Sequence, residues 1–287
     1  MSTTIAPAKI NLNLLLTGRR DDGYHLLESD VVFTEFGDNL SFAPSDHDAI
    51  EIIGPYGDTL DTANNLCLQT LAAFRAAGGI IGPVKITLTK NIPVGAGLGG
   101  GSADAAATLR YLASQTNNPQ MSSDLAAIAL SLGADVPVCL HSNSQHMSGI
   151  GEVLRPIAQS TTLAPAQTIS GTPILLANPS KPLATIDVFT AFAAANQPFS
   201  DIASVSGFTA ASDFVALGND LDQAAITIMP EIAQLLQDIK TQNGVRAAAM
   251  SGSGASCFGL FDSDANCQNA AKILTDSGYW AVASVII

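Results

Sequence analysis

The sequence is poor in positive charge. Its 12 lysine and arginine residues face 25 aspartate and glutamate residues, which gives a formal net charge of −13 at pH 7. Such a chain repels the phosphates of nucleic acids, which argues against a nucleic-acid partner. An anionic small molecule stays compatible with the sequence if the few cations are placed locally.

Long apolar runs and closely spaced cysteines are missing as well. No stretch is long enough to span a bilayer, and residues 1–7 lack the apolar core of a signal peptide, so we expect a cytoplasmic protein without a membrane partner. The cysteines Cys67, Cys139, Cys257 and Cys267 have no metal-ligand spacing, and we expect reduced thiols.

Apolar residues, in contrast, make up 47% of the 287 residues, which is enough for two domain cores. The segment 158–172 is poor in charge and rich in Ala, Thr, Pro and Gly, so the sequence predicts the domain junction there. We expect domains at residues 1–160 and 161–287.

The most informative stretch is the glycine-rich segment 93–104. It follows a predicted strand at 84–89 and leads into a predicted helix at 105–112. Glycines before a helix let the backbone approach a ligand, and the N–H groups of the first helical turn favour an anion. Ser102 is placed to cap the helix or to contact a phosphate. The segment predicts a phosphate-binding loop; the alternative is a glycine-rich turn without a ligand.

Two better-known nucleotide loops do not fit this segment. Gly95, Gly97 and Gly100 match G-x-G-x-x-G, but residues 91–93 separate them from the strand, and the nearest suitable acid, Asp124, resembles the cap of a helix at 124–132. The ATPase P-loop needs Gly-Lys followed by Ser or Thr, and the sequence has no such run.

Three other places carry candidate chemistry, each beside a plain structural alternative. Lys9, Asn11 and Asn13 alternate with apolar residues, which indicates a strand whose polar face is either solvated or the floor of a site. Tyr24 and His25 suit a flat heterocycle, or are simply a tyrosine packed beside a half-buried histidine. Asp135, which we expect to be held out of helical geometry beside a buried apolar strand, is a turn residue or a general base.

The remaining pattern predicts alternating strands and helices. Strands are expected at 31–36 and 40–42 around a turn at 37–39, and at 49–53, with a helix at 65–75 and a tight turn within 148–154. The second half predicts a strand at 174–177 and helices at 186–192, 219–228 and from 230. After these we expect two strands around a Ser/Gly turn at 251–256, a helix at 265–277 and a strand at 281–287. The fold class is α+β.

Five segments resemble, in order, the motifs of the GHMP small-molecule kinases, a superfamily that covers galactokinase and homoserine, mevalonate and phosphomevalonate kinases. They are residues 9–12, 18–25, 93–102, 133–137 and 251–254. The second and fourth most resemble the branch that phosphorylates 4-diphosphocytidyl-2-C-methyl-D-erythritol, a cytidine diphosphate sugar alcohol, in the non-mevalonate isoprenoid pathway. The resemblance implies a two-domain GHMP kinase fold, with an N-terminal domain like ribosomal protein S5 domain 2 and a C-terminal ferredoxin-like α+β domain.

The resemblance also implies roles for individual residues. Asp135 would take the proton of the substrate hydroxyl, with Lys9 orienting it. Tyr24 and His25 would hold the cytosine, with Phe189 as a second aromatic ring, and Asn11 would contact the methylerythritol end. The residues that would bind ATP are Pro93, Val94, Gly95, Ala96, Gly97, Leu98, Gly99, Gly100, Gly101, Ser102 and Ala103. Mg²⁺ is expected with ATP; its protein ligands and the oligomeric state are not assigned.

The chain departs from the superfamily pattern at Ala103 and Asp104, where relatives often have Ser and Asn. Ser102 would then contact the phosphates alone, and Asp104 is tolerable if it faces the helix dipole. Two other functions stay open. One is another GHMP kinase, such as a homoserine or mevalonate kinase, and the other is a nucleotide-binding sensor without catalytic activity.

Overall fold

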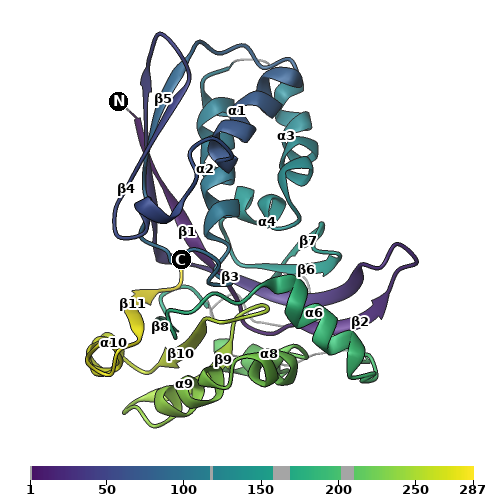
Figure 1. Cartoon of the computed structure of the whole chain (residues 1–287), viewed down its shortest axis with the longest axis vertical. Helices are drawn as coiled ribbons and strands as arrows, with labels where there is room; N and C mark the ends of the chain where they lie inside the picture. The colour runs from purple at the N-terminus through teal and green to yellow at the C-terminus, as the bar shows by residue number, and fades with distance from the viewer. Residues whose placement is uncertain (1, 117–118, 158–168, 202–209) are drawn as a thin grey trace. The chain divides into compact units, whose positions relative to one another are not determined.

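The computed structural model describes residues 2–116, 119–157, 169–201 and 210–287 (Figure 1). The chain forms two compact units. Unit 1 contains Met1–Lys9, Phe36–Val94 and Gly99–Ser142, and unit 2 contains Ile10–Glu35, Gly95–Leu98 and Asn143–Ile287. Most of the expected junction, residues 158–168, lies outside the described residues, so the division at residue 160 stays a prediction.

Unit 1 combines strands with a group of helices. β5 (Val84–Thr89) pairs antiparallel with the last part of β3 (His25–Pro44) and parallel with β4 (Ala49–Ile53). β1 (Ser2–Asn11) also pairs with β3. The helices that contact one another in this unit are α1 (Leu66–Ala76), α2 (Gly100–Ser114), α3 (Pro119–Leu132) and α4 (Val136–His141), and a short 3₁₀ turn, η1, covers Gly57–Thr59.

The core of unit 1 follows from strand and helix periodicity. Val84, Ile86 and Leu88 alternate along β5 and are buried, while the residues between them are not. The Ala-rich α2 buries one long run of its residues, from Ala103 to Leu109. Beside it, the ring of Phe42 stacks on Tyr111 with centroids 3.9 Å apart.

Unit 2 contains an antiparallel group and a separate four-stranded sheet. In the first, β2 (Leu15–Arg19) and β6 (Gln145–Gly149) each pair with the first part of β3, and β7 (Val153–Pro156) pairs with β6. The sheet has the order β11-β8-β10-β9, all antiparallel, with β8 (Pro173–Asn178), β9 (Val245–Met250), β10 (Cys257–Phe261) and β11 (Trp280–Val285).

The helices of unit 2 are α6 (Thr185–Ala194), α7 (Ala211–Val215), α8 (Asp222–Ile228), α9 (Glu231–Lys240) and α10 (Asp264–Asp276). α9 and α10 contact the four-stranded sheet and bury their apolar residues there. The chain order of strand, helices, two strands, helix and strand is that of a ferredoxin-like unit. The α+β fold class is therefore confirmed.

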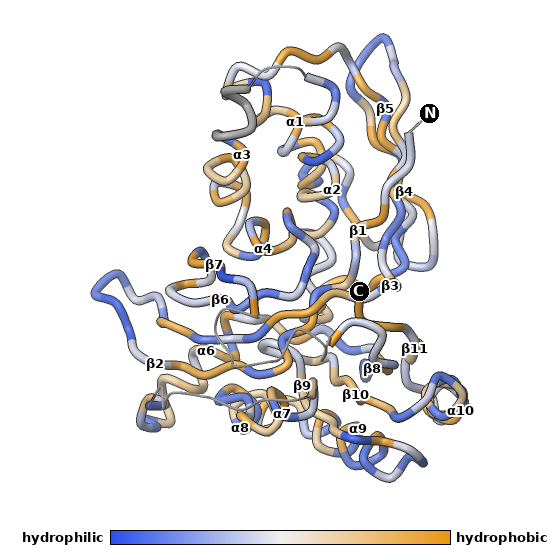
Figure 2. Tube along the Cα trace, turned by 180° about the vertical axis from the view of Figure 1, so that it is seen from behind, coloured by the Kyte–Doolittle hydropathy of each residue, from blue (hydrophilic) through white to orange (hydrophobic). Residues whose placement is uncertain are grey.

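Most expected elements are present, but several details were wrong. Residues 37–39 do not turn, because β3 runs unbroken from His25 to Pro44. Asp124 does not cap a helix, since α3 begins at Pro119. α8 begins at Asp222, later than residue 219. The charged segment between β2 and β3 does form a turn, and it is the strongly hydrophilic loop beside β2 in Figure 2.

In the part of the chain that the structure describes, no helix has the length and apolar character needed to cross a membrane. The cytoplasmic location expected from the sequence stays a prediction.

Candidate active site

The glycine-rich segment ends in the start of α2. Gly99 is the N-cap residue in a left-handed conformation, φ 64°, and no side chain caps the helix. Of the two roles that the sequence left open for Ser102, the helix cap is therefore wrong, because Ser102 lies within the first turn of α2. A Cβ atom on Gly99 would lie 3.0 Å from Cβ of Lys9, so the close approach of Lys9 requires glycine here.

Lys9 carries an ion pair beside this helix start. Its Nζ lies 2.7 Å from Oδ2 of Asp135, and the Lys9 side chain is 5% exposed whereas that of Asp135 is 41% exposed. A buried lysine needs such a partner, because an unpaired charge away from water is costly. Unit 1 thus brings together an accessible carboxylate, a buried ammonium group and the N-terminus of a helix.

Asp135 has a different local structure from the one expected. It has helical angles, φ −86° and ψ −11°, and is the N-cap residue of α4, so the apolar run after it is a helix and not a strand. Pro137 is compatible with this because a proline in the first helical turn removes an N–H that has no intrahelical partner anyway. A short apolar run does not distinguish strand from helix by its periodicity.

The polar residues of the first segment are buried. Lys9, Asn11 and Asn13 are 4%, 2% and 2% exposed, so the solvated-face alternative is wrong. In unit 2, Asn11 donates from Nδ2 to Oγ of Ser29 at 2.7 Å and from its backbone N–H to Oγ of Ser251 at 3.1 Å. Asn11 is thereby held against the turn at 251–256.

That turn packs on the middle of the glycine-rich segment, within unit 2. A Cβ atom on Gly97 would lie 2.3 Å from the carbonyl oxygen of Gly254, and the Ser256 N–H donates to the carbonyl oxygen of Ala96 at 3.1 Å. Asn219 fixes the turn as well, since its Nδ2 donates to the carbonyl oxygens of Met250 at 3.2 Å and Gly252 at 2.8 Å. Nothing local in the sequence identified Asn219.

His25 lies among phenylalanine rings in unit 2. Its ring centroid is 5.3 Å from that of Phe189, 5.8 Å from Phe192 and 6.3 Å from Phe199. Burial, with a smaller effect of Arg19, lowers the pKa of His25, so the imidazole is neutral at pH 7 and can both donate and accept. Tyr24 is 61% exposed.

Phe192 and Phe199 were not predicted. Phe192 is three residues after Phe189 on α6, and helical spacing places such a pair on one face. That spacing was the available signal for Phe192.

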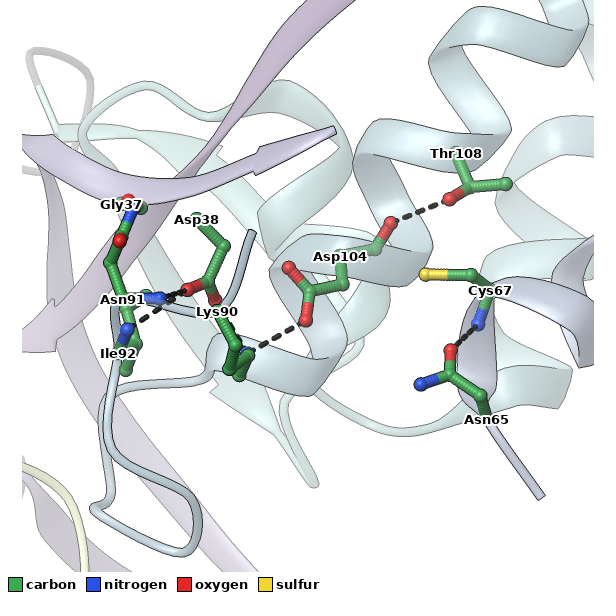
Figure 3. A network of polar contacts seen from close by, with 9 residues as sticks. All are labelled: Gly37, Asp38, Asn65, Cys67, Lys90, Asn91, Ile92, Asp104 and Thr108. Carbon is green, nitrogen blue, oxygen red and sulfur yellow. Dashed lines mark hydrogen bonds and ion pairs between the residues drawn. The ribbon is translucent and has the colours of Figure 1, made fainter. Parts of the chain in front are cut away.

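The two departures in the glycine-rich segment lie in the interior of unit 1. Ala103 is 1% exposed. The carboxylate of Asp104 pairs with Lys90, with Oδ2 and Nζ 2.7 Å apart (Figure 3). Asp104 therefore has a cationic partner, Lys90. From the sequence only the helix dipole was expected, and this ion pair was not predicted.

Two further groups of side chains concern metal ligands and thiols. Among the described residues, no group of three or more His, Cys, Asp or Glu side chains is arranged to hold a metal ion. The four cysteines are free and buried, and burial raises the pKa of Cys67 and of Cys139 to about 12. These thiols are therefore protonated at neutral pH.

Comparisons with known proteins agree with the five motifs. Residues 65–143 match the family model "GHMP kinases N terminal domain" and residues 205–279 match "GHMP kinases C terminal". The first match contains the glycine-rich segment and Asp135, and the second contains the turn at 251–256. Lys9 and His25 lie outside both.

Individual proteins give a finer assignment. The 4-diphosphocytidyl-2-C-methyl-D-erythritol kinase of Chelativorans sp. (strain BNC1) is 42% identical over 94% of this chain and 90% of its own length. A crystal structure of 4-(cytidine 5'-diphospho)-2C-methyl-D-erythritol kinase superimposes with a TM-score of 0.78 at 32% identity and covers 99% of both chains. The mevalonate kinase of Methanococcus jannaschii, at 11% identity and a TM-score of 0.67, shares the fold alone.

Identity at this level over nearly the whole chain decides between the branches of the superfamily that the motifs left open. The chain belongs to the GHMP kinases and, within them, to the family of ATP-dependent 4-diphosphocytidyl-2-C-methyl-D-erythritol kinases.

Proposed function

We propose that the protein transfers the γ-phosphoryl group of ATP to a hydroxyl of 4-diphosphocytidyl-2-C-methyl-D-erythritol, a step of the non-mevalonate isoprenoid pathway, with Asp135 as general base. The single observation that carries the assignment of roles is the Lys9–Asp135 ion pair of 2.7 Å at the N-terminus of α2. The substrate follows from the names of the relatives over nearly the full chain.

The proton transfer follows from the geometry of the ion pair. Lys9 engages Oδ2 of Asp135, which leaves Oδ1 for the substrate hydroxyl. As the hydroxyl oxygen forms its bond to the γ-phosphorus, the bond from phosphorus to the bridging oxygen of ADP breaks, and the hydroxyl proton passes to Oδ1. Lys9 is a positioning residue, because it holds the carboxylate in one orientation during this step.

The backbone binds the phosphates in this proposal. The first N–H groups of α2 have no intrahelical partner and, with the helix dipole, attract an anion. Phosphoryl transfer depends mostly on positioning and electrostatic stabilisation, so residues 93–103 with Lys9 and Asp135 form a sufficient set. Mg²⁺ would enter with ATP and neutralise developing charge; the phosphates themselves are oxygen ligands of the kind that it prefers.

The substrate base is assigned to the aromatic group around His25. A neutral imidazole between phenylalanine rings suits the polar edge and flat face of cytosine. Tyr24, Phe189 and Asn11 keep the substrate-binding roles that the resemblance implies for them.

A coupled assay of ADP release tests the function. The purified full chain receives ATP and Mg²⁺ with 4-diphosphocytidyl-2-C-methyl-D-erythritol, homoserine or mevalonate in separate reactions. We expect ADP above the alcohol-free rate with the first substrate only, and a phosphomonoester product by mass spectrometry. Turnover of homoserine or mevalonate at a similar rate contradicts the proposed substrate, and no turnover with any alcohol contradicts the kinase assignment.

A further inference from the structure

Two aspartates and one lysine form a closed polar network inside unit 1 (Figure 3). Lys90 follows β5, and its ammonium group contacts Oδ2 of both Asp38, on β3, and Asp104, on α2. The side chains of Lys90, Asp38 and Asp104 are 3%, 0% and 4% exposed. None of them belongs to the catalytic pair or to the residues assigned to ATP.

Asp38 fixes the segment that leads into the glycine-rich loop. Its Oδ1 accepts the backbone N–H of Asn91 at 2.6 Å and that of Ile92 at 2.9 Å, while Oδ2 contacts Lys90. Asn91 adds a bond from its Nδ2 to the carbonyl oxygen of Gly37 at 2.9 Å. The backbone just before Pro93 is therefore held by one buried carboxylate.

The same ammonium group fixes the other end of the loop. A Cβ atom on Gly100 would lie 3.0 Å from Nζ of Lys90 and 3.2 Å from the Ile92 side chain. Lys90 is thus in contact distance of the first residue of α2 and is bonded to Asp104 one turn later. One side chain joins the start of the loop, through Asp38, to the helix at its end.

The charges of the network are unequal. Two carboxylates share one ammonium group out of solvent, and Oδ1 of Asp104 is a buried atom without a hydrogen-bond partner in the described structure. Burial raises the pKa of the Asp104 carboxyl above its ordinary value, against the opposing charge of Lys90 and with a further contribution from the negative charge of Asp38. Asp38 instead has two backbone N–H donors and Lys90 as partners.

We infer that Asp38 and Lys90 are positioning residues of the phosphoryl-transfer site, which set the spacing between the two ends of the ATP loop, and that Asp104 serves only as a hydrogen-bond acceptor for Lys90. This inference rests on the proposed function. It also explains how an Asp can stand where relatives often have Asn, since one acceptor oxygen for Lys90 is all that the position needs.

The near-isosteric pair Asp38→Asn and Asp104→Asn tests the inference. The amide introduced by Asp38→Asn has one acceptor oxygen for the three donors that the carboxylate serves, so we expect KM for ATP to rise at least tenfold while KM for the alcohol changes less than twofold. The amide introduced by Asp104→Asn keeps an acceptor for Lys90, so its effect on KM for ATP is expected to be less than a third of that of Asp38→Asn.

Asp48→Asn is the matched control. Asp48 also pairs with a cation, Arg75, and accepts a backbone N–H, that of Val84 at 3.0 Å, but at the opposite end of β5. We expect it to lower the urea midpoint without changing KM for ATP. A purely structural network would make Asp38→Asn behave in the same way as this control.

Lys90→Arg covers the case in which Asp38→Asn does not fold. The guanidinium group keeps the charge but is larger than the ammonium group that already lies close to Gly100, so KM for ATP is expected to rise at least fivefold. Three outcomes would each overturn the inference. They are an unchanged KM for ATP in a folded Asp38→Asn or Lys90→Arg variant, equal increases of KM for ATP and KM for the alcohol, and equal effects of Asp38→Asn and Asp104→Asn. The ATP affinity of each variant can also be measured by displacement of a fluorescent ATP analogue. This measurement needs no turnover, so it distinguishes failure of the inference from failure of the proposed alcohol substrate.

Discussion

Replacing Gly101 by alanine separates a phosphate-binding loop from a glycine-rich turn without a ligand. Gly101 is the second residue of α2, is exposed, has no positive φ, and has no heavy atom within 4 Å of the position that a Cβ would take. The ligand-free protein therefore has no need of glycine there. At such a position Gly→Ala stabilises a protein by about 0.4–1 kcal/mol, because it reduces the entropy of the unfolded chain.

If a phosphate binds to the first turn of α2, the methyl group that stabilises the ligand-free protein should weaken the binding of ATP. If the γ-phosphate lies against the N–H groups of residues 100–102, the methyl group holds it away, and we expect KM for ATP to rise at least tenfold, about 1.4 kcal/mol. We therefore expect the Gly101→Ala variant to be at least as stable as the parent protein and to bind ATP more weakly.

Two other glycines of the loop calibrate the measurement. Gly95→Ala meets no neighbour but must adopt φ 69°, which costs about 1–2 kcal/mol. Gly97→Ala has a similar φ, 75°, and also places Cβ 2.3 Å from the Gly254 carbonyl oxygen, so overpacking adds about 1–3 kcal/mol. Urea denaturation should rank Gly101→Ala first, Gly95→Ala next and Gly97→Ala last. A stable Gly101→Ala variant with unchanged KM for ATP would refute the phosphate site at α2.

Three further changes test the catalytic pair, the aromatic group around His25 and the partly buried network of His146. Asp135→Asn should lower kcat by about 10²–10⁴-fold with little change in ATP affinity. The control Asp276→Asn, which breaks an ion pair on the surface, should keep the kcat of the parent. Parental kcat in Asp135→Asn would rule out Asp135 as the general base. His25→Ala should raise KM for the cytidine-bearing alcohol far more than KM for ATP, and equal increases of the two KM values contradict a contact between His25 and the cytosine. Hydrogen bonding to Asp30, opposed by burial and supported by Glu28, raises the pKa of His146. The stability that His146 contributes is therefore complete below about pH 6.5 and is lost as the pH rises through the folded-state pKa. His146→Gln should lower the urea midpoint more at pH 5.5 than at pH 9, and a loss that does not depend on pH contradicts this reasoning.

The elements around the loop were predictable because their signals are local. The strand at 84–89 alternates apolar and polar residues, and the run of alanines after residue 102 has high helix propensity, so β5 and α2 were expected at the right places. The helical spacing of residues 65–75 likewise marked α1. Each of these patterns depends on residues within a few positions of one another.

Errors arose where a local signal serves a distant contact. Gly37 and Asp38 resemble a turn, yet Gly37 is needed because a Cβ there would lie 2.2 Å from the Ala6 carbonyl oxygen, and Asp38 is needed for Lys90. No periodicity reports a contact between residues 52 positions apart. The Lys9–Asp135 pair was likewise accessible only through family resemblance, since its members lie far apart in the chain.

The charge balance of unit 1 bears on how so acidic a chain can bind a triphosphate. Lys9 and Lys90 both lie beside the start of α2, but each is already paired, and with Asp135, Asp38 and Asp104 they carry a surplus negative charge when all are ionised. A proton on Asp104 removes that surplus, which is the direction that burial favours. In the proposed function these lysines therefore fix a carboxylate and a loop, rather than attracting phosphate as free cations do. In the proposed function the attraction comes instead from backbone N–H groups and the metal ion that accompanies ATP, which explains why the site is built on glycines rather than on a basic patch.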